Sequence, residues 1–189
     1  MSGRIKLLKN GVPINSSDDP QLGYLYDAPS SVDQTCGTYG LKDYQLPNSQ
    51  CPDTFVCGVD QVTDPTLLAY IDCLNAMNCK MLDGMTSGNM ANSPIALFIH
   101  QMIPHHQNAV NMAKAFLVAR QNYTKTNGTT YCSDITNEND PTCFMEVLMR
   151  SIINSQNAQI QDMRGVLAAK GYPAEDNNCQ LNVQSSTVV

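Results

Sequence analysis

The residues best suited to chemistry lie in one segment, residues 98–116, which holds all three histidines of the chain and two of its ten methionines. Histidine nitrogen and methionine sulfur are neutral, comparatively soft donors, and together they suit copper better than magnesium, calcium or manganese. The segment also reads as a helix, in which residues four apart share a face. The question is whether that face binds a metal or forms a methionine-rich core.

The spacing within this segment sets pairs of donors one or two helical turns apart. Met102 precedes His106 by four residues, and His105 precedes Met112 by seven. The adjacent histidines His105 and His106 are separated by about 100° around a helix. Both can therefore border one interior, but they cannot point at the same spot.

Further soft donors are predicted on two other helices. Met81 and Met85 continue a four-residue ladder from Met77, and Met163 follows on the last helix. Cu(I) accepts soft ligands, and thioethers bind it without losing a proton. Gln156, a polar residue on an otherwise apolar face, is a candidate to orient a histidine through its second ring nitrogen. An ordinary buried amide is the equal alternative for Gln156.

Core packing is the competing interpretation of the methionines. Methionine fills irregular helical cores well, and taken singly Met77, Met145 and Met149 fit that role better than metal binding. His100, taken singly, fits a surface or structural role. The histidine pair with its flanking methionines leaves a metal site and a methionine-rich core equally open.

Three helices must position these residues, and each begins with a capping residue followed by a proline. The last one is closed by Gly171. Each segment carries an apolar face with the 3.6-residue period, and the connections are short. The pattern predicts an all-α fold, an antiparallel bundle of three to four helices. The predicted helices span residues 65–85, 94–121 and 141–170.

The composition divides the chain into an arm, a bundle and a tail. The arm is rich in Gly, Pro, Ser, Asp and Tyr, lacks a helical period and is predicted to be irregular and pinned by disulfides. Such an arm wraps its own domain or reaches a neighbouring copy. The parts are residues 1–63, 64–173 and 174–189.

Eight scattered cysteines predict up to four disulfides in an oxidising compartment, because no CxxC zinc spacing occurs. A Cys132–Cys143 bridge would close the loop 122–140, and Cys179 would staple the tail. Three N-glycosylation sequons, at Asn15, Asn122 and Asn127, favour a secreted protein. The cysteines are Cys36, Cys51, Cys57, Cys73, Cys79, Cys132, Cys143 and Cys179.

Charge and missing motifs argue against several classes of protein. The net charge of −6 and the pI of about 4.8 disfavour a nucleic-acid binder, and no run of 18 apolar residues predicts a membrane span. Glu-x-x-His, His-Glu-x-x-His and Gly-x-Ser-x-Gly are absent, which disfavours a di-iron centre, a zinc protease and a serine hydrolase. Catalysis is therefore not the favoured interpretation.

The segment Met-Ile-Pro-His-His-Gln at 102–107, followed by Ala-Val-Asn-Met-Ala at 109–113, resembles the hallmark of the ferritin-like helical bundle family catalogued as domain of unknown function 305. The similarity continues through residues 152–163 and covers about residues 65–173. Members are mostly exported bacterial proteins, some of which bind copper and help cells tolerate it. The resemblance implies a copper site, with Cu(I) favoured, built from Met81, Met85, Met102, His105, His106, Met112 and Met163.

Two hypotheses of function follow. The first is a secreted protein that binds Cu(I) through methionine and histidine for storage, delivery or detoxification. The second is a structural or interaction protein of an extracellular assembly, which keeps the bundle while the arm contacts neighbouring copies. A copper redox enzyme is a weaker third option, because no substrate pocket is marked in the sequence.

Overall fold

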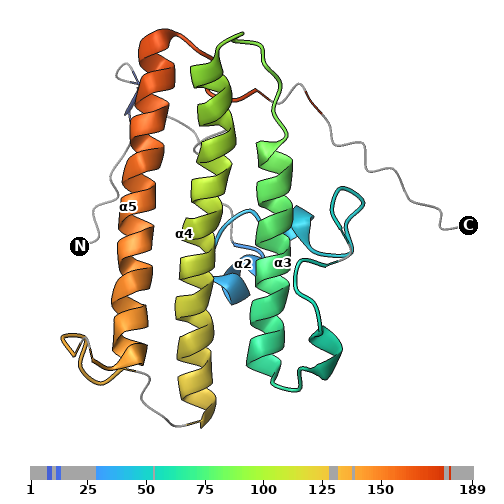
Figure 1. The fold of residues 1–189 in the computed structure, drawn as a ribbon, viewed down its shortest axis with the longest axis vertical. Helices are drawn as coiled ribbons and strands as arrows, with labels where there is room; N and C mark the ends of the chain where they lie inside the picture. The colour runs from blue at the N-terminus through green and yellow to red at the C-terminus, as the bar shows by residue number, and fades with distance from the viewer. Residues whose placement is uncertain are drawn as a thin grey trace, which may run out of the picture.

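The computed structural model describes residues 29–127 and 132–176 except Asp53 and Glu138, together with Cys179; two short strands and residues 125–127 are described as backbone. Three long helices dominate it: α3 (Pro65–Met85), α4 (Pro94–Asn127) and α5 (Pro141–Lys170). They lie side by side with alternating directions, and α4 is in the middle (Figure 1). The predicted all-α antiparallel bundle is confirmed, with three main helices.

The remaining elements are short and precede the bundle. Strands β1 (Leu8–Lys9) and β2 (Val12–Pro13) pair antiparallel. Helix α2 (Ser31–Cys36) and the 3₁₀ turns η1 (Lys42–Tyr44) and η2 (Val59–Gln61) lie in the segment that the sequence predicted to be irregular. None of the described helices is long and apolar enough to cross a membrane.

The predicted caps explain where the long helices begin and end. The Asp64 carboxylate accepts the backbone N–H groups of Thr66 and Leu67 at 2.8 and 2.9 Å, and Asp140 caps α5 in the same way. Gly171 closes α5 with a φ of 66°, a left-handed conformation that suits glycine. These signals are local, so the sequence located these boundaries well.

Helix α4 is longer than predicted, ending at Asn127 instead of near residue 121. No glycine occurs between Pro94 and Gly128, and nothing in the sequence stops the helix earlier. Asn122 is consequently an exposed helical residue, not part of a loop. The side chains of Asn15 and Asn127 lie outside the described residues.

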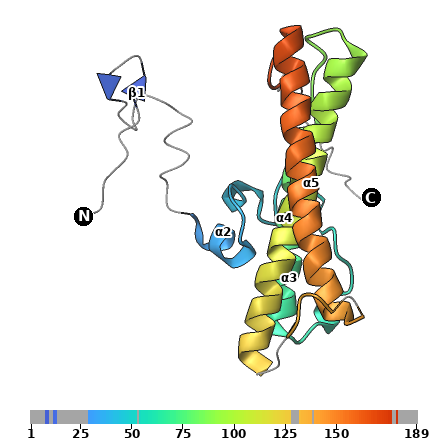
Figure 2. The same cartoon turned by 90° about the vertical axis from the view of Figure 1, so that its left-hand side faces the viewer.

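The arm from residue 29 onward is fastened to one side of the α3–α4 pair. Cys36 and Cys51 form disulfides with Cys73 and Cys79 of α3, so two bridges pin it. Leu41 of the arm is fully buried in a cluster with residues of α3 and α4. Figure 2 shows α2 on this side of the bundle, away from α5. The predicted pinning of the arm is confirmed for Cys36 and Cys51 but is wrong for Cys57, which is unpaired.

Of the up to four disulfides that the sequence predicted, the described residues form three. The favoured Cys132–Cys143 bridge is present, but Cys57 and Cys179 are exposed and unpaired. The tail is held by other means, because Asp176 accepts the backbone N–H of Met90 at 2.6 Å and its own carbonyl accepts that of Gly88 at 3.0 Å. Hydrogen bonds of Asp176 therefore hold the start of the tail, where the sequence had predicted a disulfide of Cys179.

Helices α3 and α4 approach closely where Gly84 faces Pro104. A Cβ atom added at Gly84 would lie 2.9 Å from the Pro104 Cβ, closer than real contacts allow. The proline that interrupts the hydrogen-bond pattern of α4 thus packs against the one residue type without a side chain. This contact sets the spacing of the upper α3–α4 seam.

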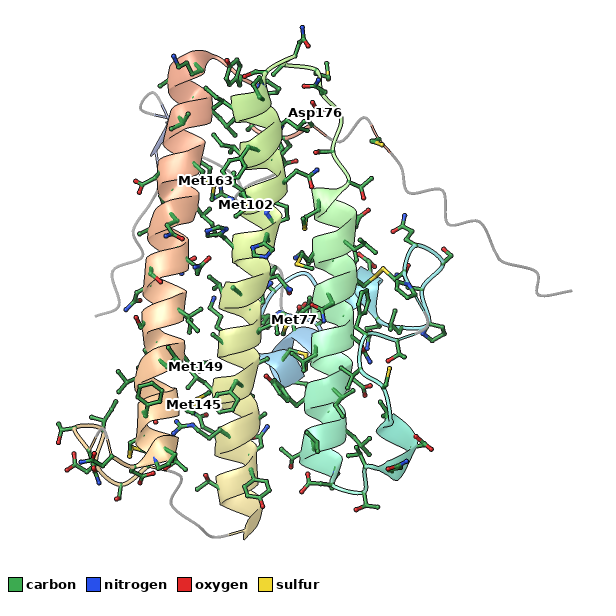
Figure 3. The ribbon with its side chains drawn as sticks, in the orientation of Figure 1. Met77, Met102, Met145, Met149, Met163 and Asp176 are labelled. Atoms are coloured by element: carbon green, nitrogen blue, oxygen red, sulfur yellow. A yellow bond between two sulfur atoms is a disulfide. The ribbon has the colours of Figure 1, made fainter. Side chains whose placement is uncertain are left out.

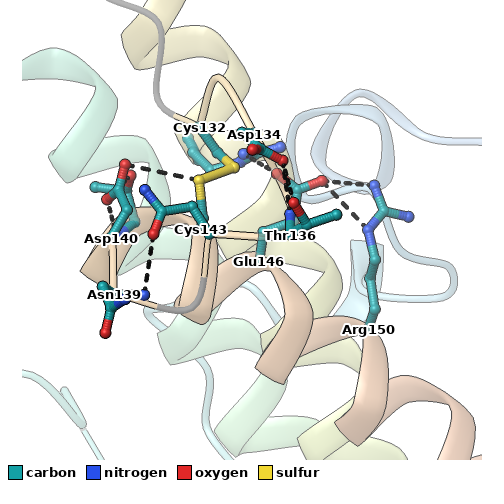
Figure 4. Close-up of a disulfide and its surroundings, with 11 residues drawn as sticks. Cys132, Asp134, Thr136, Asn139, Asp140, Cys143, Glu146 and Arg150 are labelled. Atoms are coloured by element: carbon teal, nitrogen blue, oxygen red, sulfur yellow. Dashed lines mark hydrogen bonds and ion pairs between the residues drawn. A yellow bond between two sulfur atoms is a disulfide. The ribbon is translucent and has the colours of Figure 1, made fainter.

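The lower α4–α5 seam contains an ion pair. Arg120 of α4 donates to the Glu146 carboxylate, and Arg150 pairs with the same group at 2.7 Å. Hydrogen bonds from Arg150, supported by the charge of Arg120, hold the pKa of Glu146 below its usual value although burial opposes this. Figure 4 shows Glu146 one turn beyond the Cys132–Cys143 bridge. The seam therefore combines a covalent link and a buried charge pair.

Replacing Gly84 by Ala should destabilise the bundle by about 1 kcal/mol. Overpacking of about 1–3 kcal/mol against Pro104 exceeds the helix-propensity gain of about 1 kcal/mol. Gly165→Ala is the matched control, because nothing lies within 4 Å of its Cβ position. Chemical denaturation should show a gain of about 0.5–1 kcal/mol for the control. Equal stabilisation by both substitutions would contradict the close approach.

Glu146→Gln should lower the free energy of unfolding at pH 7 by about 2–4 kcal/mol, because Arg120 loses a buried carboxylate. The folded-state pKa of Glu146 is depressed, so its contribution is present above the unfolded pKa of about 4.3 and is lost as pH falls through the folded value. Denaturation curves between pH 7 and pH 2 should thus converge for wild type and variant. Asp162→Asn, at an exposed position of α5, is the control and should change little.

Candidate metal site

Two methionine sulfurs from different helices meet at one side-chain amide. The Asn108 Nδ2 of α4 donates to the Met81 sulfur of α3 at 3.2 Å and to the Met112 sulfur of α4 at 3.6 Å. It also donates to Asn78 Oδ1 at 3.0 Å. The α3–α4 seam therefore brings together two of the predicted thioether ligands, which are far apart in the sequence.

The orientation of this amide follows from its neighbours. Thioether sulfurs only accept, so the NH₂ group of Asn108, and not its oxygen, must face Met81 and Met112. Asn108 is 6% exposed, and its Oδ1 is a buried atom with no hydrogen-bond partner among the described residues. Leaving a buried acceptor unsatisfied costs about 1–3 kcal/mol. In this orientation the amide nitrogen contacts the two sulfurs, and the amide oxygen is left without a hydrogen bond among the described residues.

His105 is the predicted ligand nearest to this group in helical position. It precedes Met112 by seven residues, so both project from the same side of α4. The His105 side chain is exposed, and its ring makes an edge-on contact with His106 at 5.9 Å between centroids. Met85 is half-buried in the last turn of α3, and its carbonyl accepts from the Gln101 amide.

A second group of predicted ligands faces α5. Met102 lies in the α4–α5 seam near Met163 (Figure 3), and Met163 packs beside the apolar cluster of Ala96, Ile99 and Leu167. The His106 Nδ1 lies 2.9 Å from the Met102 carbonyl oxygen. Because a carbonyl only accepts, this contact places the proton of a neutral ring on Nδ1 and leaves the lone pair on Nε2. This is the tautomer in which a histidine binds metal through Nε2.

Five of the seven predicted ligands therefore fall into two groups, one on the α3 side of α4 and one on the α5 side. Successive helical residues turn by about 100°, and α4 packs against α3 on one side and α5 on the other. Met81 and Met112 belong to the α3 side, whereas Met102, His106 and Met163 belong to the α5 side. His105 is exposed.

His100 has a structural role. It is 7% exposed, and its Nε2 lies 2.9 Å from the carbonyl oxygen of Pro173, just beyond α5. The contact joins the start of α4 to the turn that follows α5. The structural interpretation of His100 agrees with this position.

Gln156 does not reach a histidine. It is half-buried on α5, and within the described residues the hydrogen-bonded ring nitrogens of His100 and His106 face backbone carbonyls. Of the methionines read as core, Met77 is 1% exposed, and Met145 and Met149 lie in the α4–α5 seam (Figure 3). Core packing fits these three positions.

Harder donors do not gather anywhere in the described part of the chain. No three His, Cys, Asp or Glu side chains there are close enough to share a metal ion. Thioether sulfur is the other donor that the predicted ligand set offers. Soft monovalent ions such as Cu(I) prefer this donor, and hard divalent ions do not.

The chain matches no known protein family, no curated protein and no solved structure. The resemblance of residues 65–173 to the family described above stays a prediction.

The residues that sequence reasoning missed are the two amides, Asn108 and Asn78. Asn108 follows His105 by three residues and lies one turn before Met112. The sequence signal for Asn108 was its position as a polar residue between two predicted metal ligands on a buried helix face. Its partner Asn78 could only be found once the rotation of α3 against α4 was known.

Proposed function

We propose that this chain binds Cu(I) through thioether sulfur at the α3–α4 seam. The observation that supports the proposal is the convergence of the Met81 and Met112 sulfurs on one amide nitrogen. Two thioethers supply part of the ligand set that Cu(I) accepts. His105, on the same side of α4, is the candidate third ligand. The α5-facing group of Met102, His106 and Met163 is the alternative location.

The state of the cysteines is consistent with this ligand choice. Six of the eight form disulfides, so they are not available as thiolates. Disulfides are typical of oxidising compartments, where uncharged thioethers still bind Cu(I). We infer a secreted protein that stores, delivers or detoxifies copper, related to the ferritin-like family of domain of unknown function 305.

The test is a Cu(I) competition titration on three double variants. Met81→Leu with Met112→Leu should weaken Cu(I) binding by more than about 100-fold. Residues that only hydrogen-bond to metal ligands typically change metal affinity by about 10- to 100-fold when they are replaced. Met102→Leu with Met163→Leu reports on the α5-facing group. Met145→Leu with Met149→Leu is the matched control and should keep full affinity. Each Met→Leu change nearly conserves volume, so circular dichroism should show intact helices.

Two outcomes would count against the proposal as stated. Loss of binding only in the Met102 and Met163 variant would move the site to the α4–α5 seam. Unchanged affinity in all three variants would remove thioether coordination altogether.

A structural or interaction role is the second candidate, favoured by large apolar side chains left uncovered. Phe98 of α4 is 61% exposed and Phe144 of α5 is 50% exposed. Ile95, Val147 and Val166 are also exposed on these two helices. Exposed apolar side chains of this kind mark a site of protein association where they form a contiguous patch.

Association should appear in light scattering as a mass above 20.7 kDa that rises with concentration. Phe98→Asp and Phe144→Asp, tested singly, should shift the protein toward monomer because a buried charge is costly. Gln159→Glu, an exposed polar position on α5, is the control and should not change the mass. A wild-type protein that is monomeric at every concentration would exclude assembly through these faces.

A further inference from the structure

The Asn108 amide contacts both thioether sulfurs of the proposed site. Its nitrogen is 3.2 Å from the Met81 sulfur and 3.6 Å from the Met112 sulfur. An ion that bound both sulfurs would have to displace these N–H···S contacts, because it uses the same sulfur lone pairs. The amide hydrogens also occupy sulfur lone pairs that the ion needs.

A cavity beside Asn108 can accommodate its side-chain amide in a second position. Asn108 lines a cavity of about 130 Å³ between α3, α4 and the arm. That volume is several times the roughly 30 Å³ of one water molecule. A helix permits more than one χ1 rotamer at an asparagine, so the side chain can turn without moving the backbone.

The Asn108 amide exchanges one set of hydrogen bonds for another when it turns from the sulfurs into the cavity. In the structure the NH₂ group has three acceptors, counting Asn78 Oδ1, while the buried Oδ1 has no partner among the described residues. The cavity is lined by side chains that can donate, including Lys80, Gln107 and Asn111. Turning the amide into the cavity exchanges sulfur acceptors for donors to the orphaned oxygen.

We propose that Asn108 is a gate that caps the Met81–Met112 thioether pair and turns into the adjacent cavity when a soft monovalent ion binds. The inference rests on the proposed function and adds a residue that controls access to that site. Asn78 is the latch, because its Oδ1 accepts from the amide in the capped position. The gate acts by competition and takes no part in binding the ion.

Asn108→Ala should raise Cu(I) affinity by about tenfold, the fold-change that corresponds to one or two hydrogen bonds. Asn78→Ala should raise it less, because it loosens the latch and leaves the amide in place. Asn111→Ala is the matched control: it is buried to the same 6%, lines the same cavity and hydrogen-bonds Gln107 instead of a sulfur. Because Asn111 is one of the donors on the cavity wall, the affinity of this variant should not rise above that of wild type.

A second readout needs no metal. Hydrogen peroxide oxidises thioethers through the same lone pairs, so peptide mass spectrometry of the metal-free protein should show faster oxidation of Met81 and Met112 in Asn108→Ala. Met145 and Met149 serve as internal references, and Asn111→Ala controls for the added space. Faster oxidation together with tighter Cu(I) binding supports the gate.

The outcomes distinguish a failure of the proposed Asn108 gate from a failure of the proposed Cu(I) site. If Met81→Leu with Met112→Leu abolishes binding but Asn108→Ala binds Cu(I) no more tightly than wild type, the gate is wrong and the thioether site stands. If that methionine variant keeps full affinity, the proposed site falls and the gate with it. Unchanged oxidation rates in Asn108→Ala would show that the amide does not cap the sulfurs.

Discussion

The structure depends on the packing of α4 between two helices. In the described part of the chain α3 and α5 each pack on α4, and the three helices form a single layer. One helix must therefore bury two opposite faces, which explains why α4 carries apolar and amide residues almost all round. Helix α3 gains a second partner from the arm, whereas the main partner of α5 among the described elements is α4.

This arrangement divides the soft donors between two environments. Met102 and Met163 lie in the largely apolar α4–α5 seam. The α3–α4 seam is more polar, because Asn108, Asn78 and Lys80 lie beside the methionines there. In an apolar seam methionine side chains serve as core packing. In a seam with amides and a cavity, their sulfur atoms can interact with a polar or charged partner. The polar seam is thus the better place for chemistry.

The disulfides and the ion pair have separate mechanical roles. Two bridges hold the arm against α3, which forms the wall of the cavity beside Asn108. The third bridge and the Arg120–Glu146 pair hold the opposite end of the α4–α5 seam. The upper end is tied by His100 and Asp176 to the segment after α5. Fixed elements therefore surround the α3–α4 seam, in which the Asn108 side chain is buried.

The sequence by itself determined the helix starts, the capping residues and the Cys132–Cys143 bridge, because each depends on residues close together in the chain. It also named the donor residues, because residue type alone carries that chemistry. Only the tertiary structure decided which seam each donor faces, that Cys57 and Cys179 stay unpaired, and that Asn108 meets Met81. Those facts depend on how far one helix is rotated against its neighbour, and the 3.6-residue period of a single helix does not contain that angle.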